Sequence, residues 1–153
     1  MRNKLIVAFT FILMFNNLYS KDITIKISDL PAAARTFITE HYKENLIRII
    51  EQDLDDKDFE VRLKNKTQID FYSDGVWEKI ESKNNKELPK SIVDLLPKEA
   101  KTYISKIRPK AKVVKIENIY NKKHWEVEVF SGKEEYELKF DAKGKLISSE
   151  KTD

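Results

Sequence analysis

Few residues in this chain have the chemistry of a functional centre, and the most suggestive stretch is DLDDKDFE, Asp53 to Glu60. Its clustered carboxylates are the ligand type that calcium prefers, so the stretch invites comparison with a calcium-binding loop. Such a loop carries a glycine at its sixth position and a glutamate at its twelfth. Counting from Asp53, these positions hold Asp58 and Lys64. The spacing favours a solvated hairpin tip, and we predict no metal site there.

The remaining candidates for catalysis are two histidines and scattered serines. His41 lies among apolar residues at helical spacing, and His124 alone cannot complete a zinc site of three or four ligands. A hydrolase needs a nucleophile with a base and an orienting group, whereas the serines here occupy capping, helical or turn contexts. The chain has no cysteine and only three glycines, which excludes thiol chemistry and a phosphate-cradling loop. We predict no catalytic residue, no cofactor and a protein that is not an enzyme.

The charge and composition describe a folded domain with a densely charged surface. The 153 residues carry 29 Lys plus Arg against 26 Asp plus Glu, and 41% of the residues are hydrophobic. A nucleic-acid-binding protein concentrates positive charge on one face, whereas here both signs are abundant. We therefore expect no nucleic-acid partner. A chain of this length has room for one sizeable core or two small ones.

The first twenty residues have the order of a secretory signal peptide. Arg2 and Lys4 precede the apolar run LIVAFTFILMF, Leu5 to Phe15, and the polar tail NNLYS follows. This run is shorter than the roughly 20 residues that a membrane-spanning helix needs, which disfavours the alternative of a membrane anchor. We predict cleavage after Ser20, a periplasmic or secreted location, and no stable membrane anchor after cleavage.

The remainder contains an internal repeat. LPAAARTFI, from Leu30, recurs as LPKEAKTYI from Leu96, and Leu30–Leu63 aligns with Leu96–Val129 without a gap and with ten identical residues. Each copy opens with a proline, which is tolerated in the first turn of a helix, and continues with apolar residues at helical spacing. Alternating stretches such as DFEVRL and HWEVEVF then predict half-buried antiparallel strands.

These patterns predict an α+β fold in which each repeat packs a helix on its own four-stranded antiparallel sheet. We assign 1–20 to the signal peptide, 21–82 to the first repeat and 83–153 to the second. A short linking helix is expected at about 88–96, where LPKSIVDLL has apolar residues on one side.

The repeated motifs resemble a known family. The pattern LP-x-x-A-[RK]-T-[FY]-I, the following strands, and the strand–turn–strand ELKFDAKGKLI are similar to the PepSY-like, beta-lactamase-inhibitor-like proteins that bacteria export. The resemblance implies a helix, or a helical hairpin, on a curved four-stranded antiparallel sheet, repeated in tandem, and a function in protein binding. The chain has no cysteine, whereas true beta-lactamase inhibitors carry disulfides, and this argues against inhibition of a beta-lactamase in particular.

The sheet face opposite the helices is the candidate binding surface, although antiparallel sheets often have one face that is merely solvated. Trp77 and Tyr120 are added because aromatic residues are favoured as binding anchors, whereas Trp125 is assigned to the core. The predicted site residues are Arg62, Asp70, Tyr72, Trp77, Tyr120, Glu126, Glu128, Glu137 and Lys139.

Two functional hypotheses remain open. In the first, the protein is an exported binding module, for instance an inhibitor, that docks a protein or peptide in the periplasm or outside the cell. In the second, it is a small-molecule or cation-responsive periplasmic sensor or envelope-stress protein, in which the acidic face of the second repeat concentrates cations.

Overall fold

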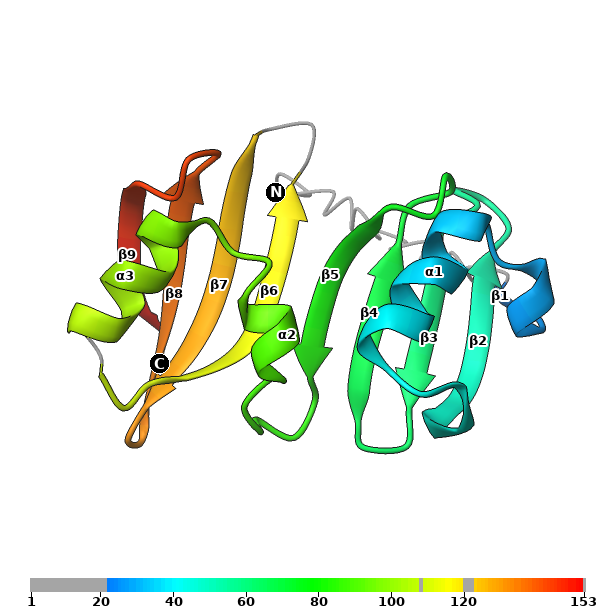
Figure 1. The fold of residues 1–153 in the computed structure, drawn as a ribbon, viewed down its shortest axis with the longest axis horizontal. Coiled ribbons are helices and arrows are strands. Elements are labelled where there is room, and N and C mark those ends of the chain that lie inside the picture. Colours follow the sequence, from blue (N-terminus) through cyan, green and yellow to red (C-terminus); the bar gives the residue numbers. More distant parts are fainter. Residues whose placement is uncertain (1–21, 108, 120–122, 153) are drawn as a thin grey trace, which may run out of the picture.

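A computed structural model describes residues 22–107, 109–119 and 123–152, and in this part of the chain nine strands form one antiparallel sheet (Figure 1). Each strand pairs with the next one along the chain. The predicted signal peptide and Tyr120 lie outside the described residues. The strands are β1 Asp22–Thr24, β2 Ile47–Asp53, β3 Phe59–Leu63, β4 Thr67–Phe71, β5 Trp77–Ser82, β6 Lys112–Ile119, β7 His124–Ser131, β8 Glu134–Asp141 and β9 Leu146–Thr152.

Within the described residues, the α-helices pack on one face of this sheet and no helix covers the other face (Figure 1). They are α1 (Ala32–His41), the short α2 (Lys90–Val93) and α3 (Lys98–Ile107), with 3-10 turns at Ile27–Asp29 and Glu44–Leu46. Pro31 immediately precedes α1, where its missing N–H leaves no hydrogen bond unmade. The described residues include no helix that is long and apolar enough to cross a membrane.

The predicted fold class, with two helices each on a separate four-stranded sheet, is wrong. β5 pairs with β6, so the strands that would have formed the edges of two sheets join them into one. The pairing places Ile80 opposite Ile116, and both side chains are fully buried in one continuous hydrophobic cluster. Two small cores would each have been marginal, and the shared sheet buries the apolar surface at their boundary.

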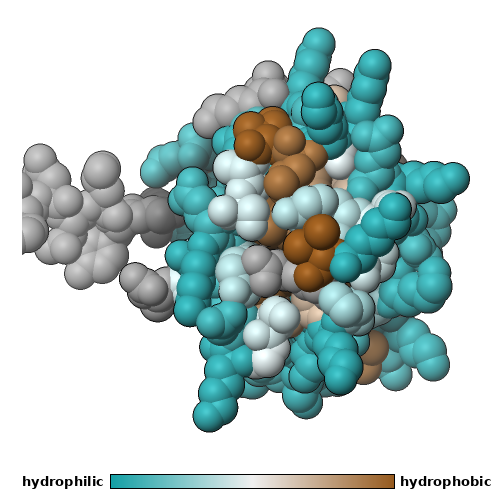
Figure 2. Space-filling view, turned by 90° about the vertical axis from the view of Figure 1, so that its left-hand side faces the viewer, coloured by the Kyte–Doolittle hydropathy of each residue, from teal (hydrophilic) through white to brown (hydrophobic). Residues whose placement is uncertain are grey.

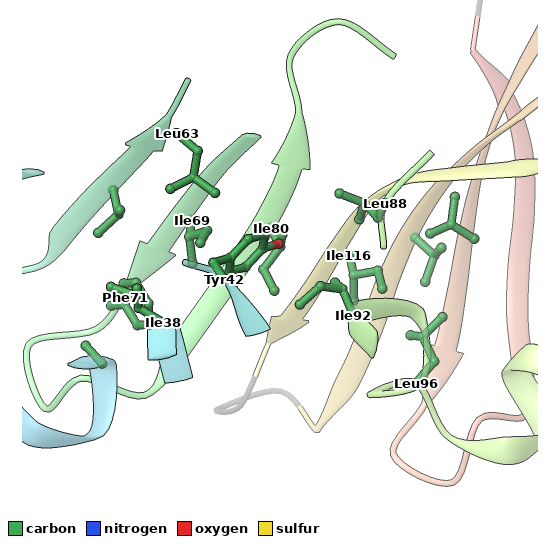
Figure 3. Packing of buried hydrophobic residues seen from close by; sticks show 14 of the residues in the cluster. Ile38, Tyr42, Leu63, Ile69, Phe71, Ile80, Leu88, Ile92, Leu96 and Ile116 are labelled. Carbon is green, nitrogen blue, oxygen red and sulfur yellow. The ribbon is translucent and has the colours of Figure 1, made fainter. Parts of the chain in front are cut away.

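The segment around α2 covers the junction between β5 and β6. Leu88, Ile92 and Leu96 are buried in the same cluster as Ile80 and Ile116. Figure 3 shows Ile92 beside Ile116, on the side of the sheet that also carries α1. This segment therefore fills the space between the two long helices, which themselves contribute Ala34, Ile38, Ala100 and Ile104.

The sheet ends at β9 in a strand with mostly exposed side chains. Figure 2 shows this end of the molecule, where hydrophilic side chains surround small apolar patches. Ile107 of α3 and Ile147 of β9 are among the large apolar residues that remain exposed. Glu150 and Lys151 lie on the same strand, and charged side chains of this kind discourage pairing with another chain at an open edge.

Candidate functional site on the open sheet face

The sheet face without helices carries a continuous layer of charged side chains. On β3 and β4 the buried residues Phe59, Val61, Leu63, Ile69 and Phe71 alternate with polar ones, which therefore point away from the helices. We call this surface the outer face. Its residues on β2 to β8 are Glu51, Glu60, Arg62, Gln68, Asp70, Glu78, Lys79, Glu81, Lys115, Glu117, Glu126, Glu128, Glu137 and Lys139.

In the first half of the outer face, ion pairs and hydrogen bonds link neighbouring strands. Arg62 Nη2 lies 3.0 Å from Glu51 Oε2, and the same guanidinium contacts Glu60. Lys79 Nζ lies 2.6 Å from Asp70 Oδ2. Gln68 Nε2 donates hydrogen bonds of 2.8 Å to both Glu60 and Asp70. The predicted site residues Arg62 and Asp70 are thus both on the outer face, joined through Gln68 and Glu60.

In the second half, cations balance most of the predicted acidic residues. Lys115 Nζ lies 2.6 Å from Glu128 Oε1, and Lys139 Nζ lies 3.1 Å from Glu126 Oε1. His124 Nε2 is 3.0 Å from the same Glu126 oxygen. Glu137 is exposed on β8, opposite Glu128. Glu126 and Glu128 of the predicted site therefore both have ion-pair partners.

The two aromatic candidates within the described residues lie in different environments. Tyr72 follows β4, and its hydroxyl donates to the carbonyl oxygen of Asn118 at 3.5 Å. Burial and the neighbouring Glu78 raise the pKa of Tyr72 to about 12. Trp77 is not on the outer face: its ring lies 5.9 Å, between centroids, from both Phe37 of α1 and Trp125. The proposed role of Trp77 as an exposed anchor is therefore corrected to packing on the core.

Carboxylates are most closely grouped where β2 and β4 end and β3 and β5 begin. A hollow of about 210 Å³ opens there, and we call it the acidic end of the outer face. Apart from Phe59, every residue around it is a carboxylate: Asp22, Glu51, Asp53, Asp58, Glu60, Asp70 and Glu78.

Burial raises the pKa values of Asp58, Glu60 and Glu78 at the acidic end, and neighbouring carboxylates push them in the same direction. These raised pKa values mean that the folded protein disfavours the ionised forms of the three side chains. Yet in the described part of the chain no three or more Asp, Glu or His side chains are grouped so as to hold a metal ion. Among the described residues, the acidic end therefore groups carboxylates without forming a preformed metal cage.

Positive charge gathers at the opposite end of the same strands. A smaller hollow of about 60 Å³ lies where β2 and β4 begin and β3 and β5 end, and we call it the basic end. Arg48 and Asp53 are five positions apart along β2, which corresponds to about 16 Å of strand. The hollow is lined by Arg48, Arg62, Lys66 and Lys83 together with Leu63, Thr67 and Gln68.

Sequence reasoning missed Arg48 of the basic end and Glu78 of the acidic end because β-bulges interrupt the alternation there. The register between β2 and β3 shifts between Ile47 and Ile49, so Arg48 falls outside the regular alternation. The register between β4 and β5 shifts beside Trp77, so Glu78 does the same. Asp58 was considered only as part of a calcium loop. A search for opposite charges at the two ends of the predicted strands would have found Asp53, Asp58 and Lys66.

The raised pKa of Glu78 predicts a pH-dependent effect of its neutralisation. Because its folded pKa lies above the ordinary 4.5, ionised Glu78 lowers native stability, and this penalty fades as pH falls from above the folded pKa to 4.5. Glu78→Gln should therefore raise the urea midpoint at pH 7, corresponding to a gain of less than about 1 kcal/mol in the free energy of unfolding. At pH 4 the same substitution should have little effect on the midpoint.

Glu126→Gln is the matched control with the opposite sign. Burial opposes ionisation of Glu126, but hydrogen bonds from Lys139 and His124 hold its pKa below the ordinary value. Glu126→Gln should lower the urea midpoint at pH 7, and the deficit should shrink as pH falls through the depressed pKa. Urea midpoints that shift in the same direction and by the same amount in both variants would contradict the opposite pKa shifts of Glu78 and Glu126.

Three crystal structures of other proteins are similar in fold to this chain. A crystal structure from Bacteroides thetaiotaomicron, described as a "putative calcium-regulated periplasmic protein", is 31% identical with a TM-score of 0.71, over 84% of this chain and 96% of that one. Two proteins from Bacteroides vulgatus, both described as "putative periplasmic", are 29% and 28% identical with TM-scores of 0.71 and 0.70. These alignments cover 86% and 85% of this chain and 98% and 99% of theirs.

No curated protein matches the chain. The descriptions of the three similar structures support an exported, periplasmic location, while cleavage after Ser20 stays a prediction. The model of the family described as "Putative beta-lactamase-inhibitor-like, PepSY-like" matches residues 16–69 and 57–148. These two segments cover most of the chain and include the motifs on which the resemblance was based. The chain therefore belongs to the PepSY-like, beta-lactamase-inhibitor-like family.

Proposed function

We propose that the protein is an exported, non-catalytic binding protein that docks a peptide segment of a partner along the outer face of β2–β5. The observation that carries this proposal is the opposite charge at the two ends of the same four strands. An extended segment with a basic side chain toward the acidic end and an acidic group toward the basic end would match both. About five residues in extended conformation span the separation.

Electrostatics supports the choice of a basic side chain at the acidic end. The ionised forms of Asp58, Glu60 and Glu78 are disfavoured there by burial and by neighbouring carboxylates. A lysine or arginine side chain would relieve this repulsion and would gain charge-assisted hydrogen bonds. Complementary charge of this kind contributes mainly to specificity and to the association rate. The outer face is thereby a selective surface rather than a merely solvated one.

Fluorescence anisotropy at low ionic strength tests the proposal with an end-blocked, labelled peptide that carries two lysines between glycines. This basic probe should bind the protein saturably. The double variant Asp58→Asn/Glu60→Gln should weaken binding about three- to tenfold, since partly exposed charge pairs contribute about 0.2–1 kcal/mol each.

The matched control removes two charges from the other half of the same face. Glu137→Gln/Glu150→Gln changes the net charge equally, so a non-specific attraction of the probe to surface carboxylates would weaken as much in this variant. The proposal predicts an affinity within about twofold of the unmodified protein. Equal weakening in both double variants would refute a localised site.

A second candidate function is a response to calcium, which the description of the Bacteroides thetaiotaomicron relative favours. The carboxylates of the acidic end supply the ligand type, although rearrangement would be needed to bring three together. Calcium, but not magnesium, should then raise the melting temperature, and Asp58→Asn/Glu60→Gln should abolish the rise. A melting temperature unchanged by calcium would exclude this second function and leave the first untouched.

A further inference from the structure

We infer that the basic end is an anion subsite that takes a carboxylate of the docked segment, with Arg48 and Lys66 as its main contacts. The inference rests on the proposed function and adds the second half of the ligand. The basic probe does not reach this subsite, so the two proposals can fail separately.

The β-bulge in β2 aims Arg48 at the basic end. Ile47 pairs with Leu63 and Ile49 pairs with Arg62, which leaves Arg48 as the extra residue without a cross-strand partner. A bulge of this kind redirects a side chain away from the regular alternation. Arg48 is exposed, lines the hollow, and forms no ion pair with any described residue.

Lys66 approaches the same hollow from the turn between β3 and β4. Its φ of +71° is in the left-handed region, which a lysine rarely occupies. Backbone hydrogen bonds hold it there: its N–H donates to Leu63 at 3.1 Å, and its carbonyl accepts from Lys83 at 3.0 Å. Its ammonium, like the Arg48 guanidinium, has no ion-pair partner within the part of the chain that the structure describes.

The other two cations of the hollow are already balanced. Arg62 pairs with Glu51 and Glu60, and Lys83 Nζ lies 2.6 Å from Glu81 Oε2. The excess positive charge of the basic end therefore comes from Arg48 and Lys66. A planar guanidinium beside a flexible ammonium suits a carboxylate, which accepts two parallel hydrogen bonds from arginine and leaves lone pairs for lysine.

The experiment compares three end-blocked, labelled peptides on the purified protein by fluorescence anisotropy at low ionic strength. One carries two lysines, one carries two glutamates, and the third, dipolar probe carries a lysine and a glutamate about five residues apart. The dipolar and acidic probes should each bind Arg48→Gln/Lys66→Gln about fivefold more weakly than the unmodified protein. The lysine probe should bind this variant at least as well.

The matched control, Lys143→Gln/Lys145→Gln, removes the same charge from the turn between β8 and β9, and all three probes should bind it as they bind the unmodified protein. Thermal melting confirms that each variant is folded. Binding of the acidic and dipolar probes that is unchanged by Arg48→Gln/Lys66→Gln would overturn the inference. So would saturable inorganic phosphate binding, tighter than the acidic probe and lost in this variant, because the subsite would then serve phosphate.

Discussion

Ile116→Ala is expected to lower the free energy of unfolding by about 2–5 kcal/mol while the protein still unfolds in a single cooperative transition. Ile116 is fully buried on β6, opposite Ile80 of β5, and both belong to the one hydrophobic cluster. Truncation removes packed methyl groups at the line where the two halves of the sheet meet. Since the core is continuous there, the loss is felt by the whole molecule.

Chemical denaturation followed by two probes checks this expectation. Tryptophan fluorescence reports on Trp77 of β5 and Trp125 of β7, whose rings lie 5.9 Å apart between centroids, and far-ultraviolet circular dichroism reports on the whole sheet. The two curves should coincide and shift together in Ile116→Ala. Ile147→Ala is the matched control, because Ile147 is 57% exposed and its truncation should cost less than about 0.5 kcal/mol. Two separate transitions would contradict the single core.

The elements within each half could be predicted from local patterns, because alternation and helical spacing are properties of neighbouring residues. The stretches DFEVRL and HWEVEVF lie in β3 and β7 as alternating strands, and the family assignment made from these motifs is confirmed. The pairing of β5 with β6 could not be predicted in this way. This pairing depends on which sheet edges meet in space, and the residue pattern within either strand does not determine that.

The candidate site was predicted only in part for a related reason. Arg62, Asp70, Glu126 and Lys139 follow the regular alternation and do lie on the outer face. The register shift beside Trp77 turns its ring to the helix side of the sheet. The residue predicted to be an exposed binding anchor therefore packs against Phe37 of α1. A register shift of the same kind in β2 places Arg48 outside the alternation, so the sequence pattern did not predict its position. A bulge changes the direction of a side chain without leaving a clear signature in residue types.

Gly144→Ala is expected to cost about 2–5 kcal/mol of stability, far more than the same change at Gly132, because it combines backbone strain with a collision. Gly144 lies in the turn between β8 and β9 with a φ of +90°. A Cβ there would come within 2.7 Å of Pro97 Cβ and 2.8 Å of the backbone nitrogen of Ala100. Neither atom belongs to a flexible side chain, so relief requires the start of α3 to move off the sheet.

Gly132 isolates the strain from the collision. It lies in the turn between β7 and β8 with a φ of +71°, and a Cβ there would meet no atom within 4 Å. Gly132→Ala should therefore cost only about 1–2 kcal/mol, measured as the shift in free energy of unfolding by urea. Equal losses at the two positions would mean that the helix start yields freely.

Gly75 extends the same test to the other long helix. A Cβ at Gly75, where φ is +84°, would lie 2.7 Å from Pro31 Cβ and 3.0 Å from the backbone nitrogen of Ala34. Gly75→Ala should then resemble Gly144→Ala in cost. The proline and alanine of LPAAARTFI and LPKEAKTYI would thereby have a common physical reason: each pair forms the surface on which a glycine turn closes against a helix.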